Sequence, residues 1–541
     1  MKFSLFRARR RRHAFRFVVV LLVISMTLVV LNDTPTGAET SLGQLDPNFG
    51  TGGKVMTGWP GAGNPNAWAN AVALQRDGKI VVAGDAFLWS SSGNHQDFAI
   101  ARYDRDGVLD PTFGSEGLLT TALLGRDEAF AVAIQSDGKI VVGGYAGYMG
   151  SEDPEFFALV RYNSDGTRDK SFGSNGKVMT QLSSFYDEVQ ALAIQPDGKI
   201  LAAGLSSDRD FALARYNTDG TLDSTFGAGG KVLTEFPLYY ASSAHGVGLR
   251  QDGHIVVAGY VAEGTIADFA LACYNPDGSL DTRFGKGGRV TADLFGKNEY
   301  GVSLAIQQDG NLIVAGNVGV WNAQNQFALA RYTEDGLLDP NFGQSGRVAV
   351  DFSPDTSSLK SLAVQPDGKV VMAGSVNKGA RGQDFLDFVV VRLNADGSQD
   401  LTFGMNGKVT TDFADDMDVA TAVCVVPDGR ILAVGYSNQT YPRASQPGFA
   451  LACYIGDATP PQITGAEVIG KKLYVYGTDF DYGAKIYLAG EKQKTANGEE
   501  DMTTMLVGKK AGKKIGHVES VLLQVQNPNG VVSNEFQFTR P

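Results

Sequence analysis

The stretch AVALQRDGKIVVAG (residues 71–84), followed by DFAIARY (97–103) and LDPTFG (109–114), decides the fold. In ANAVALQ (69–75) alanine alternates with other residues up to the Asp77-Gly78 turn, and a second apolar run follows it directly. An Asp-Gly pair between two such runs predicts a β-hairpin. The phrase DFAIARY predicts a third strand next to this hairpin.

Each of the three phrases occurs seven times, at intervals of 54–64 residues. The Phe-Gly phrase ends at Gly50, Gly114, Gly173, Gly227, Gly285, Gly343 and Gly404. The aspartate of the turn is Asp77, Asp137, Asp197, Asp252, Asp309, Asp367 and Asp428. The third phrase starts at Phe98, Phe157, Phe211, Phe269, Phe327, Phe388 and Phe449. Such periodicity is typical of a repeat architecture.

Each unit contains four short strands, the fourth being GKVMT (53–57) or its equivalent, and no segment has a long helical period. Four strands repeated seven times predict an all-β fold, a seven-bladed β-propeller. The array starts with the fourth strand and ends with FALACY (449–454), so the last unit lacks its own fourth strand. We therefore expect Gly53–Thr57 to pair beside Phe449–Tyr454, which closes the ring and leaves no open sheet edge.

The repeated phrases resemble the bacterial delta-60 repeat, whose units have the form QPDGKIVVAG, FALARYNxDG and LDxxFGxxGKV, over about residues 43–454. The resemblance implies a propeller-like, exported and mostly bacterial protein, and it implies no activity. The Asp-Gly-Lys-Ile phrase is also loosely similar to streptogramin lyase, another seven-bladed propeller.

A second domain is expected after the Pro460-Pro461 pair. Short strands with Gly and Asn turns over residues 459–541 predict an immunoglobulin-like β-sandwich, and the propeller then occupies residues 39–458. The segment resembles an IPT/TIG domain, with these matching residues: Pro461, Gly477, Phe480, Gly483, Ala484, Asn527, Pro528, Asn529, Gly530, Ser533 and Phe536.

The N-terminus has the pattern of a secretory signal. Six arginines lie between Arg7 and Arg16, an apolar run follows from Phe17 to Leu31, and the small residues Thr36 and Ala38 suit a cleavage site. We expect a signal peptide at residues 1–38, with an uncleaved N-terminal anchor as the alternative. The remainder is then secreted or displayed at the cell surface, and it touches a membrane only if this segment is retained.

Composition excludes two classes of protein. A net charge of −12 argues against a nucleic-acid-binding protein, which needs a basic surface. Three cysteines in 541 residues are too few for a disulfide scaffold.

Catalytic motifs are missing from the sequence. None of the five histidines lies close in sequence to another histidine or to a cysteine, and no nucleophile-elbow, zinc-protease or P-loop motif is present. We therefore expect a protein that is not an enzyme. The alternative is a propeller lyase or hydrolase whose acids and histidine lie at the channel mouth, the candidates being Glu128, Glu188, His245, Glu299 and Asp418.

The repeat junctions carry regularly spaced oxygen ligands. Six of them read [D/N/T]-x-D-G-x-x-D, and the first, with Asp104, Asp106 and Asp110, is a candidate calcium site. The alternative is a plain turn, in which the first residue caps the backbone and the last aspartate holds the next loop. No other cofactor is expected.

Aromatic residues gather in the variable loops at one end of the predicted strands. Exposed rings beside polar groups suit sugars or protein partners. The candidates are Trp59, Trp68, Trp89, Tyr145, Tyr148, Tyr260, Trp321 and Tyr441. We therefore expect a non-enzymatic binding or scaffold protein that recognises an extracellular glycan or protein, the alternatives being the lyase or hydrolase and a structural spacer.

Overall fold

The computed structural model describes residues 41–60, 66–89, 93–148, 154–207, 210–264, 266–319, 325–378, 385–413, 417–441, 444–457, 462–478, 480, 484–497, 505–516, 520–527 and 532–540. The expected signal segment at residues 1–38 and the boundary at 458–459 lie outside these ranges. In the part described, no helix has the length and hydropathy needed to cross a membrane.

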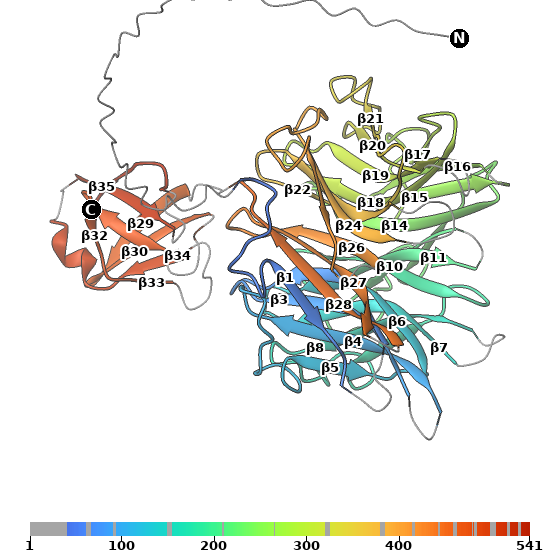
Figure 1. The fold of residues 1–541 in the computed structure, drawn as a ribbon, viewed down its shortest axis with the longest axis horizontal. Coiled ribbons are helices and arrows are strands. Elements are labelled where there is room, and N and C mark those ends of the chain that lie inside the picture. The colour runs from blue at the N-terminus through green and yellow to red at the C-terminus, as the bar shows by residue number, and fades with distance from the viewer. Residues whose placement is uncertain are drawn as a thin grey trace, which may run out of the picture. The chain divides into compact units, whose positions relative to one another are not determined.

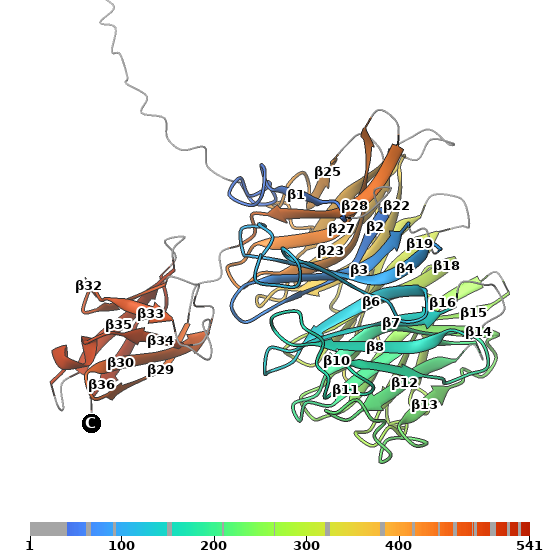
Figure 2. The same ribbon diagram turned by 90° about the horizontal axis from the view of Figure 1, so that it is seen from below.

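The described chain is all-β apart from one short 3₁₀-helix, η1 (Ala511–Lys514). Up to Tyr454 the strands come in groups of four that form antiparallel sheets, and these sheets succeed one another as the chain proceeds (Figures 1 and 2). One short parallel contact, Gln96 with Arg126, joins the first two groups into an eight-stranded sheet.

Each group runs from an inner to an outer strand. The inner strands are β2 (Asn66–Leu74), β6 (Arg126–Ile134), β10 (Asp187–Ile194), β14 (Ala241–Leu249), β18 (Asn298–Ile306), β22 (Thr356–Val364) and β26 (Asp418–Val425). The second strands are β3 (Ile80–Leu88), β7 (Ile140–Gly147), β11 (Ile200–Ser206), β15 (Ile255–Glu263), β19 (Leu312–Gly319), β23 (Val370–Asn377) and β27 (Ile431–Tyr441). The third strands are β4 (His95–Tyr103), β8 (Phe156–Tyr162), β12 (Phe211–Tyr216), β16 (Ile266–Tyr274), β20 (Gln326–Tyr332), β24 (Leu386–Leu393) and β28 (Ala444–Tyr454). The outer strands are β5 (Leu118–Thr121), β9 (Lys177–Thr180), β13 (Lys231–Thr234), β17 (Arg289–Ala292), β21 (Arg347–Val350), β25 (Lys408–Thr411) and β1 (Lys54–Thr57).

The first hairpin follows from its Asp-Gly turn. Gly78 has a φ of +83°, which glycine adopts without strain, and its amide donates to the Gln75 carbonyl at 2.9 Å. The Asp77 carboxylate accepts the amide of Lys79 at 3.2 Å, and the turn places Leu74 opposite Ile80. The turn therefore fixes the register of the two strands.

A β-bulge recurs near the middle of every inner strand. The extra residue is Asn70, Phe130, Gln190, His245, Val302, Lys360 or Thr421, depending on the group. On the second strand a glycine lies beside the bulge, and a Cβ on Gly84 would lie 1.9 Å from the Trp68 carbonyl oxygen. The bulge thus requires the glycine of the KIVVAG phrase.

The N-terminal strand completes the last group, in agreement with the sequence. Strand β1 pairs with β28 so that Thr57 lies opposite Phe449 and Lys54 opposite Ala452. Each inner strand contacts the next along the chain, and β26 also contacts β2.

The core lies between successive sheets. Val141 and Phe157 of one group, for example, pack against Val189 and Ile200 of the next without exposure to solvent. This stacking of sheets about a common centre is the architecture of a β-propeller.

Residues after 461 form two further sheets. Their orders are β29 (Gln462–Ile469), β30 (Lys472–Thr478), β34 (Met505–Gly508), β33 (Thr495–Asn497), and β32 (Glu491–Lys492), β31 (Lys485–Leu488), β35 (Ser520–Gln526), β36 (Phe536–Thr539). Leu473 and Val475 of the first sheet share a buried core with Ile486, Leu523 and Val525 of the second. This part is therefore two sheets around one apolar layer.

Candidate active site at the channel mouth

A cavity of about 510 Å³ lies among the inner strands. Its lining comes from all of β2, β6, β10, β14, β18, β22 and β26, and it includes every bulge residue. No aspartate or glutamate is among the described residues that line it. We call this cavity the central channel.

The residues two positions before the bulges form the next level of the inner strands, because alternate residues of a strand share a face. At this level stand Trp68, Glu128, Glu188, Ser243, Tyr300, Ser358 and Val419. The sequence candidates Glu128 and Glu188 are thus equivalent residues of neighbouring groups, and both are half-buried.

Glu128 is held by a tyrosine of the adjacent strand. The Tyr145 hydroxyl donates to Glu128 Oε1 at 2.5 Å, and only 3% of Tyr145 is exposed. Burial and the neighbouring Glu128 raise the pKa of Tyr145, so it stays a neutral donor. The Arg126 guanidinium lies 5.6 Å from the centre of the Tyr145 ring and binds Glu155 at 2.8 Å.

Two further carboxyl groups near Glu128 bind protons readily. Burial, then the charges of Glu155 and Glu128, raise the pKa of Glu188 to about 7. Burial, then Glu128, raise the pKa of Asp85 to about 8. Asp85 accepts from Gln96 at 2.8 Å and from Asn70 at 3.2 Å. We call Asp85, Glu128, Glu155 and Glu188 the carboxyl cluster.

The sequence did not point to Asp85, because it lies on a second strand and reaches the carboxyl cluster only through strand pairing. It lies opposite Trp68 in the sheet and is 2% exposed. Its place in the KIVVAG strand carries an acid in no other repeat, since Tyr145, Leu205, Tyr260, Asn317, Ser375 and Tyr436 stand there. That difference among the repeats is the signal that marks it.

His245 lines the central channel, on an inner strand instead of just ahead of one. Its ring stacks on Tyr260 at 5.6 Å, and its Nε2 lies 3.0 Å from the Ser243 hydroxyl. Burial and the nearby Lys360 lower the pKa of His245 to about 4, so the ring is neutral at pH 7.

Glu299 and Asp418 lie away from the channel. Glu299 is completely buried and accepts the amides of Leu294 and Phe295 at 2.8 and 2.6 Å, and Asp418, also completely buried, accepts the amide of Phe413 at 2.6 Å. When the repeats are aligned, both residues stand one position away from the place of Glu128. Because successive side chains of a strand point to opposite faces, this offset turns them away from the channel. They hold the loops that enter the inner strands.

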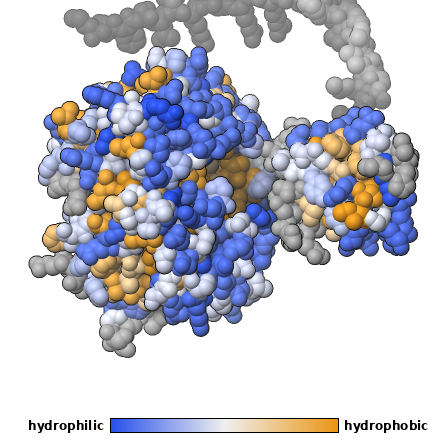
Figure 3. Space-filling view, turned by 180° about the vertical axis from the view of Figure 1, so that it is seen from behind, coloured by the Kyte–Doolittle hydropathy of each residue, from blue (hydrophilic) through white to orange (hydrophobic). Residues whose placement is uncertain are grey.

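The aromatic candidates divide by exposure. Trp59 is 7% exposed and packs on Phe449 at 4.8 Å, whereas Trp68 and Tyr260 are half-buried. Trp89 is 46% exposed and Tyr148 49% exposed, each directly after a second strand. Trp321 and the side chain of Tyr441 lie outside the described residues. In Figure 3, hydrophobic patches alternate with hydrophilic ones on the face in view of the larger part.

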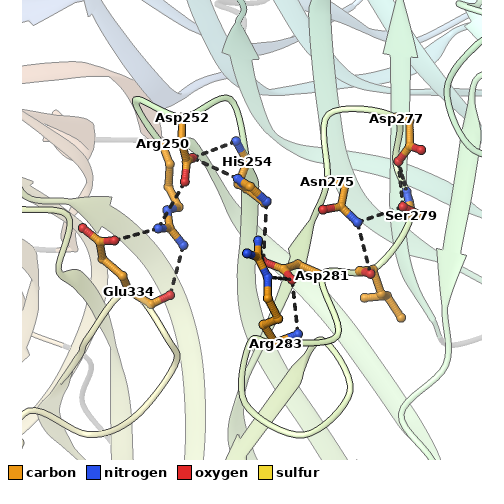
Figure 4. Close-up of polar contacts among 10 residues, drawn as sticks. Arg250, Asp252, His254, Asn275, Asp277, Ser279, Asp281, Arg283 and Glu334 are labelled. Carbon is orange, nitrogen blue, oxygen red and sulfur yellow. Dashed lines mark hydrogen bonds and ion pairs between the residues drawn. The ribbon is translucent and has the colours of Figure 1, made fainter.

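At the first repeat junction the three aspartates have protein partners. Asp104 accepts the amides of Asp106 and Val108, both at 2.9 Å, and Asp110 pairs with Arg102 at 2.9 Å and with Lys79 at 3.1 Å. Figure 4 shows the equivalent junction of the fourth unit, where Asp277 and Asp281 likewise bind residues of the turn. Calcium at Asp104, Asp106 and Asp110 stays a prediction. A rise in Tm with calcium that Asp104→Asn abolishes would support it.

Two groups of described carboxylates have ligand atoms within 4.8 Å of one another: Asp268, Asp293 and Glu299, and Asp387, Asp412 and Asp418. They occupy equivalent places between successive sheets. In the second group Lys378 pairs with Asp387 at 2.5 Å. These are the described residues whose geometry suits a metal ion.

Comparisons with known proteins agree with the fold. Six segments match a family model described as "Domain of unknown function (DUF5122) beta-propeller", at residues 75–113, 135–172, 195–226, 250–284, 307–342 and 365–403. The comparison with curated proteins gave no match. The chain is a β-propeller protein.

Solved structures similar to this chain include three kinds of enzyme. One is a fungal alcohol oxidase of the AA5 family in complex with copper, at 13% identity over 90% of this chain and 99% of that one, with a TM-score of 0.44. A PL25 ulvan lyase is 12% identical over 74% and 96%, with a TM-score of 0.42. The endo-arabinase of Bacteroides thetaiotaomicron VPI-5482 is 12% identical over 50% and 94%, with a TM-score of 0.30. At these values the similarity concerns the fold and assigns no activity.

One expectation is corrected by these comparisons. We expected a protein that is not an enzyme, but the similar structures include polysaccharide lyases and arabinanases. The missing short motifs were not sufficient grounds for that expectation. Catalytic groups can come from separate strands, so a missing motif does not exclude a site.

Proposed function

We propose that this chain is an exported β-propeller enzyme that cleaves a glycan, as a hydrolase or a lyase, at the mouth of its central channel. In this proposal the seven four-stranded groups make one closed ring of blades, and the C-terminal sheets are an accessory immunoglobulin-like module of IPT/TIG type. The observation that carries the activity is the carboxyl cluster on three neighbouring blades.

The cluster supplies an acid and a base in one place. Hydrolysis of a glycosidic bond needs a protonated carboxyl group for the leaving oxygen and a carboxylate that acts as base or nucleophile. Glu188, with its pKa near 7, is partly protonated at neutral pH and is the acid in this scheme. Glu128, oriented by the Tyr145 hydroxyl, is the base or nucleophile. A water molecule supplies the hydroxyl group that the new reducing end gains.

A glycan is supported by the aromatic side chains near this mouth. Asp85 and Tyr145 lie near the ends of β3 and β7, and the exposed Trp89 and Tyr148 come directly after those ends. Exposed aromatic rings beside polar groups suit the faces of sugar rings. The N-terminal sequence pattern supports export, which would bring the enzyme to extracellular glycans.

The test is a screen of the purified chain against polysaccharides, with reducing ends and unsaturated products measured separately. An unsaturated product identifies a lyase, and a reducing end without unsaturation identifies a hydrolase. Glu128→Gln and Glu188→Gln are expected to lower kcat at least about a hundredfold. The exposed Glu235→Gln serves as the matched control and should retain full activity. Equal rates in all four proteins would overturn the proposed site.

A further inference from the structure

Lys360 occupies an unusual place in the central channel. It is the bulge residue of β22, and its side chain lines the cavity together with His245. It forms no hydrogen bond or ion pair with any residue that the structure describes. Because the lining contains no described acid, no carboxylate of the lining balances its charge.

Several other lysines of the repeats are paired. Lys139, Lys199 and Lys369 bind aspartates at 2.8, 2.9 and 2.6 Å. Lys177 and Lys231 donate to backbone carbonyls at 2.6 and 2.7 Å. The Lys360 side chain is solvent-exposed within the channel, and partial burial by the surrounding protein lowers its pKa. An unpaired ammonium group with protein on several sides gains from an incoming anion more than a lysine on an open surface does.

The neighbours of Lys360 add donors and a flat surface. Ser303 and Ser361 accept the amides of Leu362 and Val423, each at 3.2 Å, and each hydroxyl keeps its own hydrogen to donate. The neutral ring of His245, stacked on Tyr260, supplies an aromatic surface, and it offers the Nδ1–H when the Ser243 hydroxyl donates to Nε2. Hydroxyl, imidazole and ammonium donors around one cavity suit an oxyanion.

We infer that the substrate is an acidic saccharide, whose carboxylate or sulfate group enters the central channel and binds Lys360. The saccharide part rests on the proposed function, whereas the anion site depends only on the channel. Glu128 and Glu188 lie two residues before the bulge level on their strands, a separation of roughly 7 Å at about 3.3 Å per residue. The bound anion would therefore lie about one sugar ring below the carboxyl cluster.

The acids above the channel do not oppose this arrangement strongly. The raised pKa values of Asp85 and Glu188, about 8 and about 7, leave both groups largely or partly protonated at neutral pH. The remaining charge of Glu128 is separated from Lys360 by the two-residue offset and lies on a different blade. An anion at the bulge level thus meets a cation first.

The test is calorimetric titration of the full chain at pH 7 and low ionic strength with sodium sulfate, sodium glucuronate and glucose. We expect sulfate or glucuronate to bind and glucose to give no heat. Lys360→Met should weaken anion binding at least tenfold, while Lys286→Met, at an exposed lysine, leaves it unchanged. Which anion binds more tightly tells a sulfated glycan from a uronic-acid glycan. No heat from either anion, or equal binding by Lys360→Met, would overturn the inference.

Folding of the variant is checked by its Tm. Removing an unpaired cation from a channel should leave the Tm of Lys360→Met equal to or above that of the wild type, so lost binding is then not due to unfolding. If Lys360→Met is unfolded, Lys360→Gln replaces it in the titration. If the anion binds but no polysaccharide is cleaved, the proposed function is wrong and the anion site is still supported. Cleavage of a neutral polysaccharide that Lys360→Met does not impair would overturn the assignment of an acidic substrate and leave the proposed enzyme standing.

Discussion

The hydroxyl of Tyr103 donates a hydrogen bond to the hydroxyl of Thr57 at 2.8 Å, and both side chains are buried. Tyr103 ends β4 of the first group, whereas Thr57 belongs to β1, the strand that completes the last group. This one bond therefore joins the two ends of the array. The same contact recurs between successive groups in four other pairs: Tyr162 and Thr121, Tyr216 and Thr180, Tyr274 and Thr234, and Tyr454 and Thr411.

The fifth group breaks the pattern and provides a matched comparison. Tyr332 is buried, but Ala292 stands where five of the other groups have threonine and one has Val350, and the Tyr332 hydroxyl has no partner among the described residues. We predict that Tyr332→Phe stabilises the protein by about 1 kcal/mol, because it removes a buried hydroxyl that makes no hydrogen bond. Tyr103→Phe should destabilise it by about 1–3 kcal/mol, because the Thr57 hydroxyl is left unpaired.

Chemical denaturation of the three proteins measures both effects. Ala292→Thr, which restores the missing partner, should stabilise the wild type and have no benefit in the Tyr332→Phe background. The same sign for Tyr103→Phe and Tyr332→Phe would contradict this account of the interface.

Acid should destabilise the propeller through the junction aspartates. Burial alone would raise the pKa of Asp110, but hydrogen bonds from Thr112 and Lys79 and the charge of Arg102 outweigh it and hold that pKa well below 3.8. A folded-state pKa below the unfolded value gives stability that is present above about pH 4 and lost as the pH falls further. Asp110→Asn should cost about 1–3 kcal/mol at pH 7 and less at pH 3, as followed by denaturation at each pH. An equal loss at both values would show that the Asp110 charge is unimportant.

Much of the fold can be predicted from the sequence, because each repeat has the same pattern of four strands and the same Asp-Gly turn. The pairing of Gly53–Thr57 beside Phe449–Tyr454 follows from the missing strand of the last unit, and β1 does pair with β28. The site is harder to predict from the sequence. When the repeats are aligned, Glu299 stands only one position away from Glu128, yet Glu128 lies at the channel mouth and Glu299 is buried. Asp85 comes close to the carboxyl cluster only because of strand pairing, and the order of residues in the sequence does not show which residues pair across strands.

Asp85 should make the protein less stable at alkaline pH. Its pKa rises on folding to about 8, so the folded state keeps a proton that the unfolded state loses. The free energy of unfolding therefore decreases as the pH rises from about 4 to 8. Asp85→Asn should flatten this decrease, measured as the free energy of unfolding against pH. An unchanged slope would mean that another group causes it.

We predict that Trp89 contributes to glycan binding and Trp59 to the stability of the fold. Trp89→Ala, at a side chain 46% exposed, is expected to raise KM for the glycan several-fold with little change in Tm. Trp59→Ala, at a side chain 7% exposed that packs on Phe449, should destabilise the fold by about 3–5 kcal/mol. Kinetics and melting curves of the two variants separate these roles. A large Tm loss in Trp89→Ala would place Trp89 in the structure instead of the binding surface.

The pH dependence of kcat for glycan cleavage tests the central claim most directly, because it depends on the protonation of Glu188. With a pKa of about 7, the acid form is lost as the pH rises, so the rate should fall above about pH 7. Glu188→Gln should reduce kcat and abolish this fall, while Glu235→Gln keeps the wild-type profile. A wild-type rate that stays flat from pH 6 to about pH 9, or a Glu188→Gln profile identical to it, would contradict the account.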